Sequence, residues 1–134
     1  MSNICKVVIL GENAVGKTCI VNRYISGTFR ETVVSAGASF DSKTIFFEEY
    51  GRSIKFEIWD TGEDYRRYNV HKKLYKDASA CIFVYDISRK DTFDQLKKYG
   101  INTVKKNLNV DSCNLIFNNK IFCKYSVCNC GKQM

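Results

Sequence analysis

The chain has 134 residues, with 45% hydrophobic and 26% charged side chains and a formal net charge of +7. A chain of this length forms one domain, and none of its uncharged apolar runs is long enough to span a membrane. Its basic residues are scattered along the sequence and accompany no recognised nucleic-acid-binding module, so we expect no nucleic-acid partner.

The first predicted unit is a strand followed by a loop and a helix. An apolar run predicts a strand from about Cys5 to Leu10, and a helix is predicted from about Gly16 to Ile25. The loop between them reads Gly11-Glu12-Asn13-Ala14-Val15-Gly16-Lys17-Thr18, which has the G-x-x-x-x-G-K-T spacing of a phosphate-binding loop. A strand before and a helix after are the context in which this spacing indicates phosphate binding.

Each part of this loop has a physical role in binding phosphate. The glycines let backbone N–H groups point at phosphate oxygens, and the helix N-terminus adds positive potential. Lys17 would bridge the outer phosphates, and the Thr18 hydroxyl would ligate Mg²⁺. The nucleotide-binding residues predicted in this segment are Gly11, Asn13, Ala14, Val15, Gly16, Lys17, Thr18 and Cys19.

The middle of the chain predicts an antiparallel pair of strands and then a buried strand. Residues 29–38 have no clean periodicity and form a predicted loop. Strands are predicted at about 40–48 and 53–59, joined by a turn at 50–52, and a polar helix at about 65–75. The continuous apolar run at 80–86 is typical of a parallel strand that is covered on both faces.

The last predicted elements are a helix and a strand. Ser88 and Asp91 have the spacing of a capping box at a helix start, and apolar residues then recur at helical spacing as far as Leu108. Residues 114–117 predict the final strand. The alternating order predicts an α/β domain with a mostly parallel sheet, helices on both faces, and ligands at the carboxyl ends of the strands.

Three further stretches make the chain similar to a known family. They are Gly37-Ala38-Ser39-Phe40, Trp59-Asp60-Thr61 and Val84-Tyr85-Asp86-Ile87. Together with the phosphate loop, they resemble the Ras superfamily of small GTPases, and within it the Rab branch, from about Ile4 to Lys120. The resemblance implies the P-loop NTPase fold and a monomeric switch in vesicle traffic that binds GTP or GDP with Mg²⁺.

The resemblance also implies partners and a location. Effectors and exchange or activating proteins would bind the two switch regions, residues 29–40 and 62–75. Cys5, Cys19 and Cys81 lie within apolar patterns, where reduced cysteines are common. This agrees with a cytoplasmic protein, or with one that is peripheral on intracellular membranes.

The family assigns further residues to the phosphates and the metal. Ser35 would contact Mg²⁺ and the γ-phosphate, and Asp60 would hold Mg²⁺ through water. Either Gly62 or Glu63 would replace the glycine whose N–H senses the γ-phosphate in the second switch. The metal ligands implied by the resemblance are Thr18, Ser35 and Asp60.

The family also assigns residues to the base. Phe29 would pack against the guanine, and Asn119 and Lys120 match the start of the base-reading motif N-K-x-D. Phe122 stands where that motif has its aspartate. An apolar ring cannot accept hydrogen bonds from the purine, so the sequence leaves guanine selectivity open.

The second switch departs from the family at the position that supports hydrolysis. It reads Gly62-Glu63-Asp64-Tyr65 where the family has A-G-Q-E. An ungapped alignment puts Asp64 in place of the water-positioning glutamine, and an alignment with two deletions keeps Gly62 but removes that glutamine. Because neither alignment retains the group that orients the attacking water, we expect slow or absent hydrolysis, with Asp64 the one candidate at the catalytic position.

The resemblance ends after Phe122. We predict an incomplete small-GTPase domain at residues 1–122, ending after the fifth strand, and an irregular tail with cysteines at 123–134. One hypothesis is that residues 121–128 fold back as a strand across a turn at Asn118-Asn119. Cys128 and Cys130 are followed by four residues, so a terminal lipidation signal is not expected.

Two other functions stay open from the sequence. The altered second switch and Phe122 favour a pseudo-GTPase that acts as a protein-interaction module. A phosphate loop without the guanine-reading acid also allows a nucleotide-binding protein that accepts ATP. Nucleotide binding separates the first alternative from the switch, and competition between purines separates the second.

Overall fold

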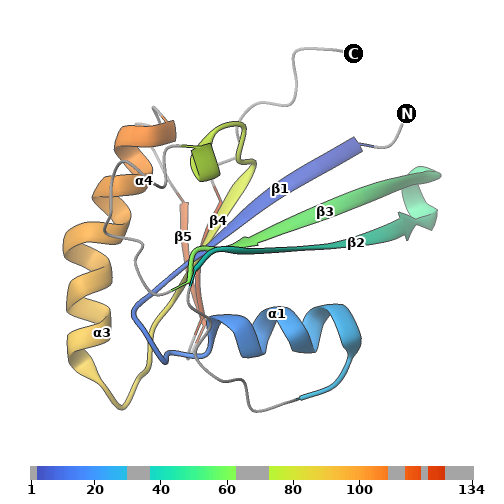
Figure 1. The fold of residues 1–134 in the computed structure, drawn as a ribbon. Helices are drawn as coiled ribbons and strands as arrows, with labels where there is room; N and C mark the ends of the chain where they lie inside the picture. The colour runs from blue at the N-terminus through green and yellow to red at the C-terminus, as the bar shows by residue number, and fades with distance from the viewer. Residues whose placement is uncertain (1–2, 30–36, 63–72, 109–113, 119–120, 126–134) are drawn as a thin grey trace.

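The computed structural model describes residues 3–29, 37–62, 73–108, 114–118 and 121–125, with side chains as far as residue 105 (Figure 1). These residues form one six-stranded sheet of order β2-β3-β1-β4-β6-β5. The strands are β1 (Asn3–Leu10), β2 (Ser39–Phe47), β3 (Arg52–Asp60), β4 (Ala80–Val84), β5 (Asn114–Asn118) and β6 (Ile121–Tyr125). The helices are α1 (Lys17–Ser26), the short 3-10 helix η1 (Glu48–Tyr50), α3 (Lys90–Gln95), the π-helical turn η2 (Leu96–Gly100) and α4 (Ile101–Leu108).

The centre of the sheet is parallel and its flanks are antiparallel. Strand β1 pairs in parallel with β3 on one side and with β4 on the other. Strand β2 pairs antiparallel with β3, and β6 pairs antiparallel with both β4 and β5. The predicted α/β class is confirmed, but the described sheet is mixed rather than mostly parallel, because hairpins flank its parallel core.

Two hydrophobic clusters lie on opposite faces of the sheet, because neighbouring strand residues point in opposite directions. On one face, Val8 and Leu10 pack with Leu96 and Val104 from the long helical segment that begins with α3. On the other face, Ile9 and Ile58 pack with Val21 of α1. Figure 1 shows α1 on one side of the sheet and α3 with α4 on the other.

The helical segment after β4 is continuous but changes its winding in the middle. Residues 90–108 run through α3, η2 and α4 without a break. Gly100 lies at the end of the π-helical turn, where an added Cβ would be 3.0 Å from Cδ1 of Leu96 and 3.5 Å from Cε1 of Phe83. The absence of a side chain at Gly100 therefore lets this turn pack closely onto β4.

The capping box predicted at Ser88 is wrong. Arg89 is the N-cap residue of α3, and no side chain caps the helix. The Ser88 hydroxyl instead donates to the Asp86 carboxylate at 2.6 Å, and the Ser88 N–H donates to the same Oδ1 at 2.9 Å. The helix begins one residue later than the capping box requires, so Ser88 precedes the N-cap residue and its hydroxyl bonds within the turn to Asp86.

The last two strands form a hairpin whose second strand enters the sheet. Strand β6 lies between β4 and β5, with Ile121 opposite Val84 of β4 and opposite Asn118 of β5. The hypothesis that residues 121–128 fold back as a strand is confirmed over residues 121–125. Residues 126–128 and the turn residue Asn119 lie outside the described residues. Strand β6 is a sixth strand, so the expectation that the sheet ends after its fifth strand is wrong. Strand structure crosses the predicted boundary between residues 122 and 123, and the division into domain and tail stays a prediction.

Candidate functional site

The phosphate loop lies at the carboxyl ends of β1 and β4. Its first residue, Gly11, has no room for a side chain, because a Cβ there would be 2.2 Å from the carbonyl oxygen of Val84. Ala14 and Gly16 have positive φ angles of 58° and 99°. Gly16 adopts that conformation without strain, and its carbonyl accepts the Ile20 N–H at 3.0 Å in the first turn of α1.

Lys17 is held inside the loop. Its Nζ donates to the carbonyl oxygens of Gly11 and Glu12, at 2.9 Å and 2.8 Å, and the residue is only 6% exposed. The side chain therefore curls over the loop that surrounds the predicted phosphate position. A buried ammonium at this place provides the positive charge that phosphate binding requires.

Thr18 and Asp60 meet across the site. The Thr18 hydroxyl donates to Oδ2 of Asp60 at 2.6 Å, and the Gly62 N–H donates to Oδ1 at 3.0 Å. Asp60 is 1% exposed, so both of its oxygens have donors in a buried setting. Thr61 anchors this corner to β1, because its N–H and its hydroxyl both donate to the Ile9 carbonyl, at 3.3 Å and 2.9 Å.

The donor atoms of Thr18 and Asp60 suit a magnesium ion. Mg²⁺ prefers oxygen ligands and is held in nucleotide sites by one or two protein oxygens together with phosphates and water. A hydroxyl and a carboxylate lie within hydrogen-bond distance of each other at the mouth of the phosphate loop. Among the residues that the structure describes, no group of three His, Cys, Asp or Glu side chains forms a separate metal site.

The two predicted switch regions touch each other at Gly37 and Gly62, the described residues next to the undescribed ranges 30–36 and 63–72. A Cβ added to Gly62 would be 2.2 Å from the Gly37 carbonyl oxygen, and the φ angle of Gly62 is 66°. Both glycines have positive φ angles. The two loops therefore meet backbone against backbone, beside the carboxylate of Asp60.

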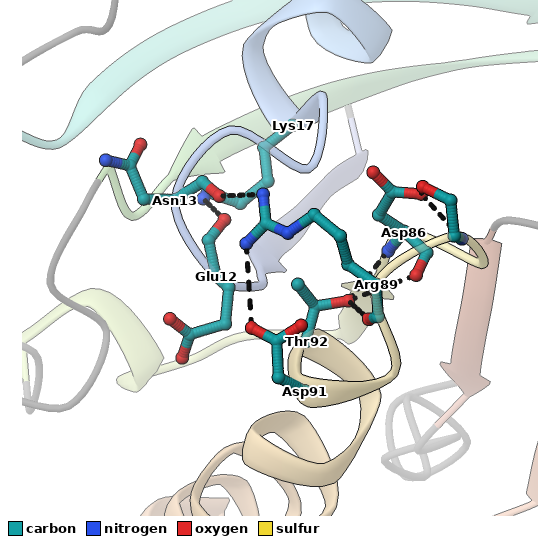
Figure 2. Close-up of polar contacts among 8 residues, drawn as sticks. Glu12, Asn13, Lys17, Asp86, Arg89, Asp91 and Thr92 are labelled. Carbon is teal, nitrogen blue, oxygen red and sulfur yellow. Dashed lines mark hydrogen bonds and ion pairs between the residues drawn. The ribbon is translucent and has the colours of Figure 1, made fainter.

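The start of α3 adds a side chain that the sequence analysis missed. Arg89 extends toward the phosphate loop, and its Nη1 is 3.5 Å from the Asn13 carbonyl oxygen, while its Nη2 is 3.9 Å from the Asp91 carboxylate (Figure 2). The two residues Asn13 and Arg89 are 76 positions apart, and no periodic or motif signal links them. A basic residue within two positions of the predicted helix start is the only clue that the sequence offers.

The remaining predicted site residues divide into two groups. Phe29 is 69% exposed, Val15 packs against the cluster beneath α1, and Cys19 is half-buried in the first turn of α1. The predicted residues Ser35, Glu63, Asp64, Asn119 and Lys120 lie outside the described residues. Phe122 is part of β6, opposite Phe83 of β4. The assignments to nucleotide and metal stay predictions.

Comparison with known proteins gives the family. A family profile described as "Ras of Complex, Roc, domain of DAPkinase" matches residues 6–121. Rab-12 of Mus musculus and of Homo sapiens are each 36% identical over 120 residues, which is 89% of this chain and 48% of the relative. RabF1 of Dictyostelium discoideum is 33% identical over 118 residues, 88% of this chain and 60% of the relative.

The chain spans about half the length of the Rab-12 relatives that it matches. Within the described part, no helix is long and apolar enough to cross a membrane. The matched region covers the phosphate loop, the Thr18–Asp60 pair and β4. The family profile, the Rab relatives and the geometry of the loop agree, and the chain therefore belongs to the Ras superfamily of GTPases as a Rab-like member.

Proposed function

We propose that this chain is a guanine-nucleotide switch that binds GTP or GDP with Mg²⁺ and presents its switch regions to partner proteins. The observation that carries the proposal is the phosphate loop itself: a buried Lys17 ammonium inside the loop, next to a Thr18 hydroxyl paired with Asp60. This combination supplies a cation for the phosphates and oxygens for a metal at one place.

The residues of the loop have distinct tasks in binding. Backbone N–H groups from Gly11 to Thr18 would donate to phosphate oxygens, and Lys17 would exchange its two carbonyl acceptors for the outer phosphates. Thr18 and Asp60 would hold the Mg²⁺, which when bound supplies positive charge that offsets the charge of the phosphates. Phe29, which is exposed next to α1, is free to cover the base.

The contact between Gly37 and Gly62 would couple the movements of the two switch regions. Residues 37 and 62 are the described ends of the loops that would respond to the γ-phosphate, and their backbones already touch. The Gly62 N–H is bound to Asp60. A γ-phosphate that attracted this N–H would move Gly62 and thereby shift Gly37, so both loops would change together.

Hydrolysis and cellular role belong to the same proposal. The sequence lacks the water-positioning glutamine, so we expect intrinsic hydrolysis to be slow or absent and the readout to be partner binding. The relatives are Rab proteins, which supports effectors and regulators as partners and vesicle traffic at intracellular membranes as the process.

Equilibrium binding of fluorescent GDP and GTP to the purified chain, with Mg²⁺ present, tests this function. GTP should displace the probe and ATP should not, and Lys17→Ala should abolish binding. Lys55→Ala, which removes an equal charge from a partly exposed ion pair with Glu57 on β3, is the matched control. A folded wild-type chain that binds neither probe would be a pseudo-GTPase, and displacement by ATP would mean that the site does not select guanine.

A further inference from the structure

The turn that precedes α3 holds the backbone of Arg89 rigidly. The Arg89 N–H donates to the Asp86 carbonyl at 3.0 Å, and the Arg89 carbonyl accepts from the Thr92 N–H at 3.0 Å and from the Thr92 hydroxyl at 2.7 Å. The Thr92 hydroxyl also accepts the Asp86 N–H at 3.0 Å. Thr92 is 0% exposed, so this turn is fixed from inside the protein (Figure 2).

The side chain of Arg89 makes longer and weaker contacts than its backbone. Its guanidinium reaches the Asn13 carbonyl oxygen at 3.5 Å and the Asp91 carboxylate at 3.9 Å, and both contacts are long. The side chain is 41% exposed. Figure 2 shows the guanidinium between the phosphate loop on one side and Asp91 on the other. Nη1 faces the loop and Nη2 faces Asp91, so the guanidinium lies between two acceptors and reaches neither at an optimal distance.

Three consecutive carbonyls of the phosphate loop have cationic partners. Lys17 bonds to Gly11 and Glu12 from inside the loop, and Arg89 contacts Asn13 from outside. If phosphates draw Lys17 away from its carbonyls, as the proposed function requires, Arg89 can stay where it is because α3 anchors it. The contact between Arg89 and Asn13 then fixes this part of the phosphate loop to the start of α3.

We propose that Arg89 is a positioning residue that fastens the phosphate loop at Asn13 to the start of α3, and that Asp91 weakens this fastening by competing for the guanidinium. The effect of Arg89 on nucleotide release rests on the proposed function, whereas the contact between Arg89 and Asn13 does not depend on a nucleotide. A loop fixed in this way loses less conformational freedom on binding phosphate, and a bound nucleotide leaves it more slowly.

The first test measures dissociation of fluorescent GDP from four variants in Mg²⁺. Arg89→Ala should release the nucleotide about threefold faster, because one long, half-exposed charge-assisted hydrogen bond is at the low end of its usual range. Arg89→Lys should recover part of the difference. Asp91→Asn should release the nucleotide more slowly than wild type, since the competing carboxylate is gone. Lys90→Ala, which removes the same charge from the exposed neighbouring residue, should release it at the wild-type rate.

The second test needs no nucleotide and measures amide hydrogen exchange in residues 11–18 of the nucleotide-free chain. Arg89→Ala should speed exchange in this loop, Asp91→Asn should slow it, and the thermal midpoints should stay within the range of Lys90→Ala. Opposite effects in this direction cannot arise from the stability of α3, because loss of Arg89 from its N-terminus should stabilise the helix and loss of Asp91 should destabilise it, which would slow exchange in the first variant and speed it in the second.

The two tests separate the possible failures. If the wild-type chain binds no nucleotide but loop exchange still depends on Arg89, the proposed function fails and the fastening stands. If nucleotide binds but Arg89→Ala and Asp91→Asn change neither release nor loop exchange, the fastening is wrong and the switch stands. A change of the same sign in both variants also overturns the inference.

Discussion

At the scale of single residues, the site depends on a few atoms with little room around them. Asp60 is buried and receives a hydroxyl from Thr18 and an N–H from Gly62. Gly62 in turn lies against Gly37, and Gly11 lies against Val84. The loop motif predicted Thr18 as a metal ligand and the family resemblance implied Asp60 as another, but the contact between Gly37 and Gly62 could not be predicted, because no pattern relates the two loops.

Thr18→Val tests the hydroxyl at the proposed metal position. Valine has nearly the same shape but cannot donate to Asp60 or ligate Mg²⁺, so the Mg²⁺-dependent part of nucleotide affinity should fall by about tenfold or more. The measurement is a titration of fluorescent GDP with and without Mg²⁺. Thr44→Val, at an exposed position on β2, is the control. An unchanged magnesium dependence in Thr18→Val would contradict the assignment of Thr18 as a ligand.

Gly62→Ala tests the contact between the loops. Alanine at a φ of 66° is strained by about 1 kcal/mol, and its Cβ would also be 2.2 Å from the Gly37 carbonyl oxygen. Gly51→Ala is a matched control, since Gly51 has a φ of 58° but nothing within 4 Å of the added Cβ.

Both glycine variants should lower the free energy of unfolding in urea, and Gly62→Ala should lower it more. The difference between them reports the clash with Gly37, because the backbone strain is common to both. Equal losses of stability would show that the two loops separate at no cost.

At the scale of elements, the positions of helices and strands followed from the sequence pattern, but their terminal details did not. The helix predicted at 16–25 is α1 at 17–26, and the strand predicted at 53–59 is β3 at 52–60. The capping box failed at Ser88 because Arg89 is the N-cap residue of α3, and Ser88 lies one residue before it with its hydroxyl bonded to Asp86. Hydrophobic periodicity records the average direction of side chains, whereas a helix end depends on individual hydrogen bonds.

Lys6→Met tests a cross-connection between β1 and the end of the second switch region. Lys6 lies on β1, and its Nζ donates to the carbonyls of Lys73 and Lys76 at 3.3 Å and 2.8 Å, 4.8 Å from the centre of the Trp59 ring. Methionine keeps the apolar stem and removes the donors. Amide exchange at residues 73–79 should therefore become faster.

Lys43→Met is the matched control for this prediction. Its Nζ donates to the Tyr24 carbonyl at 2.8 Å and lies 4.9 Å from the centre of the Tyr24 ring, which is an equivalent arrangement at the end of α1. It should speed exchange around Tyr24 and leave residues 73–79 unchanged. Similar exchange profiles in the two variants would mean that the Lys6 contacts do not hold this segment.

At the scale of the whole molecule, the order of elements was predictable and the pairing at one flank was not. Alternating strand and helix patterns predicted the α/β class and a mostly parallel sheet, and only the centre of the sheet is parallel. Nothing in residues 114–118 indicated that another strand would separate them from β4. Both segments contain short apolar runs, so the sequence pattern does not indicate which of them pairs with β4, and the pairing depends on contacts between residues far apart in the chain.

Deleting residues 121–134 tests what the inserted strand contributes. The deletion removes β6, which pairs with β4 beside Phe83 and Val84, and these two residues are 0% and 1% exposed in the intact fold. The open edge of β4 and the apolar surface beside it should make the shortened chain aggregate and unfold at lower urea concentration. Deleting residues 126–134 keeps every described strand and should change neither property. Equal solubility and equal urea midpoints for the two deletions would contradict a structural role for β6.

The π-helical turn in the segment 90–108 has a consequence for how this helix tolerates a change of length. Leu96 and Val104 are eight residues apart, a spacing that in a regular α-helix separates two side chains by about 80° around the axis. Both are nonetheless buried in the same cluster, because the wider turn at 96–100 absorbs one residue. Removing a residue from most helices rotates everything that follows by about 100° and takes it out of the core. Here the loss of Lys97 or Lys98 would turn the segment into an ordinary α-helix with Leu96 and Val104 still aligned, so this is the place where the helix can become shorter without losing its register.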